Sequence, residues 1–236
     1  MFDIDREHPE YKLLKGTWKK CRDLYAGGDQ FHANATEYLI RRHREPLDVY
    51  YERLQRVFYE NYLGSIIDWY AATLFRREPI LSFQGQSETA KAFYGRFVED
   101  CDLRGTSLTD FFRKALTEAM VCGKAYVLVD FPRTSGVARN RAEEEAAGTT
   151  RAYLVECSPQ DVINWSHDEQ GNLEWAVIRT AKLRQKRPGD SEWVRETKWV
   201  HYDKEAFRTY RRVEGQPDAS RPELVDEGRH GLARLS

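Results

Sequence analysis

Residues 118–132 read EAMVCGKAYVLVDFP, in which a Gly-Lys pair stands beside a very apolar run. The pair has two interpretations: a phosphate-binding loop, or the corner at which a helix ends and a buried strand begins. A phosphate-binding loop needs a strand first, then several glycines, then a helix whose N-terminal amides face the phosphate. Here the pattern places the helix before Gly123 and the strand after it, and neither Ser nor Thr follows Lys124. We therefore expect Gly123 to end the helix in the left-handed conformation and residues 124–131 to form a strand.

Beyond this strand the sequence changes to alternating patterns. Residues 132–150 hold Pro, Ser, two Gly and runs of charge, which predict a long solvated loop. From Arg151 onward the apolar period is two, and turn signals such as Gly171 recur, which is typical of antiparallel strands. We expect an antiparallel β meander to make up most of residues 123–214. The remaining residues, 215–236, are expected to be a polar tail.

Residues 1–122 are expected to be mainly helical. The most apolar helix is predicted to begin at Asn61 and to be stopped by Pro79, because bulky side chains recur there at a period of 3.6. Arg76 and Arg77 suit the last turn of such a helix. The bulky side chains are Tyr62, Ile66, Tyr70 and Leu74, widened by Leu63, Ile67 and Ala71. With so much of its circumference apolar, this helix is expected to be largely buried. Asp68 interrupts the pattern; we expect it to lie on the narrow polar face or to pair with an arginine, and not to act in catalysis.

The order of helices first and strands second defines an α+β fold. No uncharged apolar run reaches the roughly 18 residues that a membrane span needs. The N-terminus is charged within three residues, unlike a secretory signal. We therefore expect a soluble protein that is made in the cytoplasm and does not associate with a membrane.

The composition bears on the kind of partner. The chain has a net charge of -1, whereas a protein that grips DNA usually has a basic balance. It is rich in aromatic residues, with 13 Tyr, 11 Phe and 6 Trp. Such residues are favoured at interfaces between chains, although an aromatic-rich core explains them equally well.

Residues with catalytic or metal-binding chemistry are dispersed. The histidines form no HExxH motif, no GxSxG elbow is present, and no two cysteines form a CxxC pair, so we expect buried reduced thiols. The histidines are His8, His32, His43, His167, His201 and His230, and the cysteines are Cys21, Cys101, Cys122 and Cys157. His167, Asp168 and Glu169 fall at a predicted hairpin tip, where polar residues need no special cause; a metal site there is the minor alternative. We assign no catalytic, cofactor-binding or metal-binding residue, and we do not expect an enzyme.

A compact basic cluster, RRHR, occupies residues 41–44 and is followed by Tyr50 and Tyr51. It is suited to contact with DNA phosphates or with acidic neighbours. A solvated basic face is the simpler interpretation.

Three stretches, in their order and spacing, resemble the portal proteins of tailed bacteriophages. Residues 61–79, NYLGSIIDWYAATLFRREP, are similar to the portal helix that ends in Lys or Arg followed by Pro. Residues 116–130, LTEAMVCGKAYVLVD, are similar to the portal step from helix through glycine to strand. Residues 153–165, YLVECSPQDVINW, with residues 171–179, GNLEWAVIR, resemble the portal run of proline, strand and hairpin.

The resemblance implies a fold like the portal wing and a homo-oligomeric ring, commonly of twelve subunits, at one capsid vertex of the virion. It implies that double-stranded DNA passes through the ring during packaging and ejection. Terminase, the major capsid protein and head–tail adaptor proteins would be its partners. Portals continue into stem, clip and crown regions, so we expect this sequence to be part of a longer chain. A near-neutral charge suits a conduit, because every strong contact with DNA must be broken as the DNA slides.

Two other interpretations stay open. One is a different virion component, a head–tail adaptor, against which the helical N-terminal half and the length weigh. The other is a nucleic-acid-handling enzyme, which requires a clustered set of acid/base or metal-binding residues.

Overall fold

The computed structural model describes residues 3–82, 87–131, 151–185, 187, 189, 191–215 and 221–230. The chain divides into two compact units, a helical unit, Lys15–Ala125, and a sheet unit made of Met1–Leu14 and Tyr126–Ser236. The expected mixture of helices with an antiparallel sheet is confirmed. The division differs from the expected one at the N-terminus, because Met1–Leu14 belongs with the strands and not with the helices.

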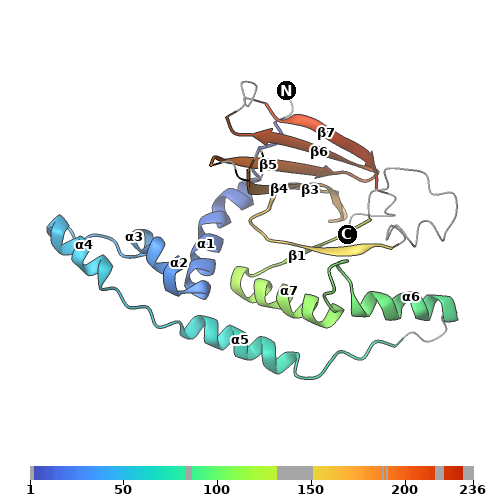
Figure 1. Ribbon diagram of the computed structural model, residues 1–236, viewed down its shortest axis with the longest axis horizontal. Coiled ribbons are helices and arrows are strands. Elements are labelled where there is room, and N and C mark those ends of the chain that lie inside the picture. Colours follow the sequence, from blue (N-terminus) through green and yellow to red (C-terminus); the bar gives the residue numbers. More distant parts are fainter. Residues whose placement is uncertain are drawn as a thin grey trace. The chain divides into compact units, whose positions relative to one another are not determined.

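Seven helices are present in the described residues, and Figure 1 labels them along the chain. They are α1 (Pro9–Ala26), α2 (Gly28–Ala33), α3 (Ala35–Tyr38), α4 (Leu47–Gln55), α5 (Tyr62–Leu74), α6 (Glu88–Glu99) and α7 (Leu108–Cys122). Serines begin the last two: the hydroxyl of Ser87 accepts the N–H of Ala90, and that of Ser107 accepts the N–H of Asp110. Each cap satisfies a backbone donor that the first helical turn leaves without a partner.

The corner at Gly123 has the predicted order. Helix α7 ends there, with Gly123 in the left-handed conformation at a φ of 79°, and strand β1 (Tyr126–Asp130) follows. Glycine adopts this conformation without a steric penalty, which explains why the helix stops at this residue. The strand is shorter at both ends than the predicted residues 124–131.

Asn61 fastens the start of α5 to the end of α1. Its Oδ1 accepts the N–H of Gly64 at 2.8 Å, and its Nδ2 donates to the carbonyl oxygen of Tyr25 at 2.7 Å. This arrangement requires a residue without a side chain at Gly64. A Cβ placed there would lie 2.7 Å from Asn61 Nδ2 and 2.9 Å from the Tyr25 carbonyl oxygen.

We expect Gly64→Ala to lower the free energy of unfolding by about 1–3 kcal/mol, because the added methyl group overpacks a backbone contact. The sign is diagnostic, since an unhindered glycine-to-alanine change inside a helix stabilises by roughly 0.5–1 kcal/mol. Gly95→Ala in α6 is the matched control, because nothing lies within 4 Å of its added Cβ. Urea unfolding followed by circular dichroism measures both; equal shifts for the two variants would contradict the packing argument.

The strands form two antiparallel sheets and not one meander. Strand β1 pairs with β2 (Tyr153–Cys157) as a separate ribbon. The other five strands lie in the order β3-β4-β5-β6-β7, each joined to the next along the chain (Figure 1). They are β3 (Val162–His167), β4 (Leu173–Gln185), β5 (Trp193–Tyr202), β6 (Ala206–Val213) and β7 (Glu223–Arg229). Residues 215–236 were expected to be a polar tail, but they include the strand β7. Its alternation of apolar and charged residues is too short to predict a strand, whereas in the structure β6 provides a pairing partner along its length.

The N-terminal arm, residues 3–11, is held to the five-stranded sheet by specific contacts. Asp5 Oδ1 accepts hydrogen bonds from Trp199 Nε1 at 2.8 Å and from Arg179 Nη1 at 2.9 Å. His8 stacks on Trp165 with ring centroids 4.1 Å apart, and its backbone N–H donates to the carbonyl oxygen of Ile163. These pairs explain why the first residues belong to the sheet unit.

None of the helices in the described ranges is both long and apolar enough to cross a membrane.

Candidate interaction surface

Helix α5 packs inside the helical unit through its smallest residues. Gly64, Ile67 and Ala71 are its buried positions, and they lie three and four residues apart on one side of the helix. This side faces α7, in which Phe111 and Ala115 are buried. A face built from Gly and Ala allows the two helices to approach closely.

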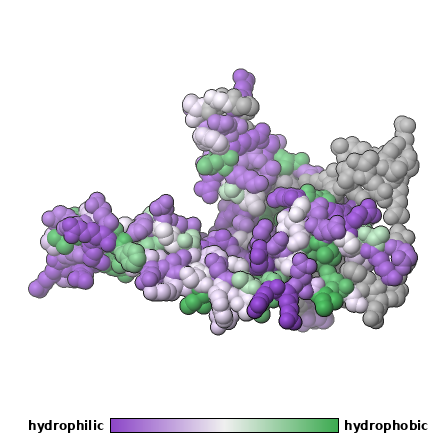
Figure 2. Space-filling view, turned by 60° about the horizontal axis from the view of Figure 1, so that its bottom comes forward, coloured by the Kyte–Doolittle hydropathy of each residue, from purple (hydrophilic) through white to green (hydrophobic). Residues whose placement is uncertain are grey.

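The bulky side of α5 is turned outward. We define the α5 outer face as five residues whose exposed fractions are all above one half: Tyr62, Ile66, Trp69, Tyr70 and Leu74. The prediction that this helix is largely buried was therefore wrong for its largest side chains. Figure 2 shows hydrophobic residues at the surface among hydrophilic ones.

The energetic consequence of this exposure is large. Burying one fully exposed side chain of this size contributes roughly 1.5–3 kcal/mol. Because these five are a little over half exposed, covering them would contribute about 4–9 kcal/mol before entropic costs. Large exposed apolar patches on folded chains commonly mark interaction sites. Its aromatic content, two tyrosines and one tryptophan, matches the residues that anchor protein interfaces.

The apolar surface has further members in the preceding segment of the helical unit. Leu47, Val49 and Tyr51 on α4 are exposed, and Phe58 in the connection to α5 is 83% exposed. The segment between α3 and α5 therefore presents large apolar side chains that the described part of this unit leaves uncovered.

The basic cluster at residues 41–44 lies just before α4 and is fixed to it by Glu45. The Glu45 carboxylate accepts two hydrogen bonds from Arg53, both at 2.9 Å, and one from the backbone N–H of Arg42 at 3.0 Å. Arg41 Nε donates to the Glu45 carbonyl oxygen at 2.7 Å. The bonds from Arg53 and then Arg42 lower the pKa of Glu45 to about 2. The cluster is thus an exposed charged loop that Glu45 anchors to α4. This geometry is compatible with both predicted interpretations, a solvated face and a contact with acidic or phosphate groups.

Glu45→Gln gives a pH-dependent prediction. Because the folded-state pKa of Glu45 lies below its ordinary value of 4.5, its carboxylate stabilises the fold above about pH 4.5, and this contribution is lost as the pH falls toward about 2. The difference in Tm between the wild type and Glu45→Gln should be largest near neutral pH and should decrease toward zero as the pH is lowered. Glu52→Gln, at an exposed pair with Arg56, is the control and should change Tm little at neutral pH. A Glu45→Gln difference that does not vary with pH would contradict the argument.

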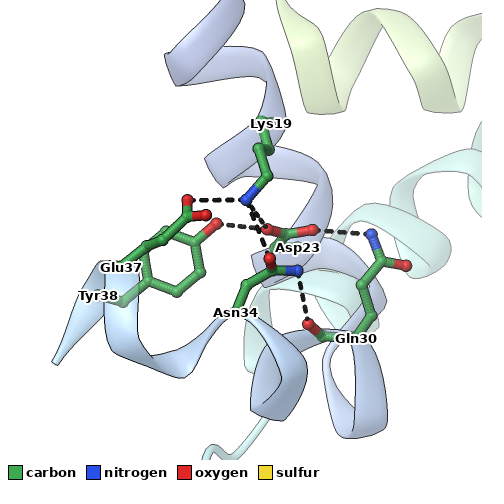
Figure 3. Close-up of polar contacts among 6 residues, drawn as sticks. All are labelled: Lys19, Asp23, Gln30, Asn34, Glu37 and Tyr38. Carbon is green, nitrogen blue, oxygen red and sulfur yellow. Dashed lines mark hydrogen bonds and ion pairs between the residues drawn. The ribbon is translucent and has the colours of Figure 1, made fainter.

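A polar network ties α1 to α2 and α3, as Figure 3 shows. Buried Asp23 accepts hydrogen bonds from Tyr38 Oη and from Gln30 Nε2, and it pairs with Lys19. Lys19 Nζ also donates to Glu37 at 2.7 Å. Burial acts to raise the pKa of Asp23, but the hydrogen bonds from Tyr38 and Gln30, with the charge of Lys19, leave it lowered. The carboxylate is therefore a satisfied structural anion and not a proton donor.

The other residues singled out from the sequence have structural partners. Asp68 Oδ1 accepts a hydrogen bond from Tyr25 Oη at 2.7 Å, so its partner is a tyrosine and not an arginine. Lys124 Nζ lies 5.4 Å from the centre of the Trp18 ring, a cation–π geometry. Neither arrangement resembles a catalytic or phosphate-binding one.

The segment of His167, Asp168 and Glu169 includes the turn between β3 and β4. Asp168 accepts backbone N–H groups of Gln170 and Asn172, and the Asn172 side chain is the first cause of its lowered pKa. No group of three or more His, Cys, Asp or Glu residues suited to a metal ion occurs in the described residues. Cys101, Cys122 and Cys157 are buried, whereas Cys21 is half-buried. The predicted loop at residues 132–150 lies outside the described part of the chain.

Two features of the structure had no signal in the sequence. The pairing of Asp5 with Arg179 and Trp199 joins residues more than 170 positions apart, and no local pattern predicts it. The exposure of the α5 outer face also escaped prediction, because an apolar stripe does not reveal whether its cover comes from the same chain.

Comparison with protein-family models gives no match to this chain, and comparison with curated proteins gives no significant match either.

Proposed function

We propose that this chain is a structural subunit of a tailed-phage portal, which assembles into a closed ring at one capsid vertex. Double-stranded DNA passes through that ring during packaging and ejection. Terminase, the major capsid protein and head–tail adaptor proteins dock on it. In this role the chain provides rigid surfaces and performs no chemistry.

The observation that carries the proposal is the α5 outer face. Helix α5 uses its small residues for contacts within the unit and leaves its large ones exposed. A chain that works alone gains nothing from this arrangement, whereas a ring subunit needs an apolar patch for its neighbour. In a ring the contact is heterologous, so the α5 outer face meets a different surface of the next subunit.

The arrangement of polar groups supports a building block. Asp23, Asp68 and Glu45 are each occupied by hydrogen bonds that fix helices and loops. Lys124, the residue that first suggested a phosphate site, lies against an aromatic ring. These groups serve packing, which favours a structural protein over a catalytic one.

Light scattering coupled to size exclusion, with negative-stain images, tests the proposal. At micromolar concentration the protein should elute at a multiple of its 27.7 kDa mass, and class averages should show rotational symmetry. A strictly monomeric particle, or an open filament with no closed ring, would count against a portal. The neighbouring genes give an independent check: a terminase gene upstream and a capsid gene downstream are expected.

A further inference from the structure

The hairpin of β4 and β5 extends beyond the rest of the five-stranded sheet. Strand β3 pairs with β4 only as far as Ile178, and β6 pairs with β5 only from Glu196 onward. Beyond these two residues, toward the tip of the hairpin, β4 and β5 continue to pair with each other as far as Gln185 and Trp193. The end of the hairpin is therefore a two-stranded ribbon with both edges uncovered by strands in the described residues.

The register gathers positive charge on one face of this ribbon. Residues directly opposite each other in antiparallel strands share a face, as do residues two apart along a strand. By this rule Lys182, Arg184 and Lys198 share a face with Glu196, and Arg211 joins them from β6, opposite Lys198. Arg184 lies in the two-stranded part, whereas Lys182, Lys198 and Arg211 lie where β6 already pairs with β5. We call these four cations the basic ribbon face, which runs from the hairpin onto the sheet.

Glu196 holds two of the cations in place. Its carboxylate is almost fully buried and pairs with Arg184 Nη1 at 3.0 Å and Lys198 Nζ at 3.2 Å. Burial acts to raise the pKa of Glu196, but the contacts with Arg184 and Lys198 keep it lowered. The side chains of Arg184 and Lys198 nevertheless remain 60% and 49% exposed. A buried anion thus positions two cations whose other donors point toward solvent, so less entropy is lost when they bind an anion.

The charge of this face is not balanced by nearby carboxylates. Glu196 is shared between two cations, Arg211 has Glu223 only at 3.7 Å, and Lys182 has no ion pair within the described ranges. Lys182 and Lys198 are exposed. The face is therefore electropositive on a chain whose net charge is -1.

The two faces of the ribbon suit different ligands. On the face opposite the cations, Leu183 and Trp193 are exposed beside Arg195. The apolar residues among the four charges, Val194 and Val213, are half-buried. A protein partner is usually held by large apolar anchors, whereas a nucleic acid backbone is held by cations alone.

We propose that the basic ribbon face binds the phosphate backbone of duplex DNA without reading its sequence. The inference rests on the proposed function for the choice of DNA as the polyanion, but the contact does not require a ring. Four phosphate contacts bind firmly at low salt and weakly at higher salt, which is compatible with DNA that must slide.

The test is fluorescence anisotropy of a labelled duplex of mixed sequence, titrated with the full chain. With four contacts, affinity should fall about a hundredfold between about 50 mM and about 200 mM salt. The double variant Lys182→Gln, Lys198→Gln leaves two contacts, so its affinity should fall only about tenfold over the same range. Both lysines are exposed and Arg184 still pairs with Glu196, so the fold should be kept.

The matched control is Lys20→Gln with Lys114→Gln, two exposed lysines of the helical unit that change the net charge equally. It should retain the wild-type salt dependence. The proposal is overturned if the wild type does not bind the duplex at low salt, if the control loses as much affinity as the ribbon variant, or if polyglutamate competes as well as unlabelled duplex. Light scattering on the same samples separates the two proposals, because loss of DNA binding with intact oligomers contradicts only the ribbon, and monomers that still bind DNA contradict only the ring.

Discussion

Ile66→Asp is expected to convert the proposed ring to monomers while leaving the subunit folded. Ile66 is 54% exposed in the single chain and central in the α5 outer face, so a carboxylate there is solvated until a neighbour covers it. On assembly the variant loses about 1–1.5 kcal/mol of apolar burial and must also desolvate an unpaired charge, at a cost of several kcal/mol. Together these terms exceed about 3 kcal/mol per contact, which corresponds to more than about a hundredfold in Kd.

Light scattering measures the loss of assembly, and thermal unfolding checks the subunit. The free energy of unfolding of the Ile66→Asp monomer should stay within about 0.5 kcal/mol of the wild-type value, as for other exposed surface substitutions. Its Tm should therefore change little. Leu13→Asp is the matched control, because Leu13 is a 78% exposed apolar residue on another helix, outside the α5 outer face. If Ile66→Asp assembles as the wild type does, or if Leu13→Asp disrupts the assembly equally, the α5 outer face is not the subunit contact.

Trp199→Ala is expected to lower the free energy of unfolding by about 3–5 kcal/mol, the range for removing a buried tryptophan. Trp199 is fully buried, and its Nε1 donates to Asp5 at 2.8 Å. The guanidinium of Arg212 lies 5.0 Å from the centre of its ring. The change therefore leaves a cavity and also removes a hydrogen bond that holds the N-terminal arm.

Trp193→Ala on the same strand is the control. It removes the same side chain from a site that is 60% exposed, so it should change stability by no more than about 0.5 kcal/mol. Urea unfolding followed by circular dichroism compares the two without relying on tryptophan fluorescence. Equal losses would mean that burial at Trp199 is not what stabilises the sheet unit. A small loss for Trp199→Ala with faster proteolysis of the first residues would show that the residue mainly holds the arm.

The two predictions address different parts of the proposed subunit. Ile66→Asp tests an apolar surface that is exposed in the single chain. Trp199→Ala tests a core residue that is fully buried within the single chain.

Local sequence was sufficient where a local rule applies. Gly123 ends α7 and precedes β1 as predicted, because the left-handed conformation at a helix end depends on the glycine and its immediate neighbours. The period-two pattern after Arg151 likewise predicted antiparallel strands, since alternation reflects a sheet with one covered face. The helix predicted from Asn61 to Pro79 is present as Tyr62–Leu74: its start was predicted to within one residue, but it ends before Arg76 and Arg77.

What these patterns left open was how each element is covered. The periodicity of α5 revealed apolar residues around most of the helix, but the close approach permitted by Gly64 and Ala71 decided that the small face packs inside and the large face points out. The strand β7 and the arm contact of Asp5 with Arg179 depend on partners distant in the chain, which no short window contains. The sequence determined the elements and their order, because these follow from local backbone preference and from the period of the apolar residues. The tertiary structure determined which faces are exposed, because the burial of one face depends on which other parts of the chain pack against it.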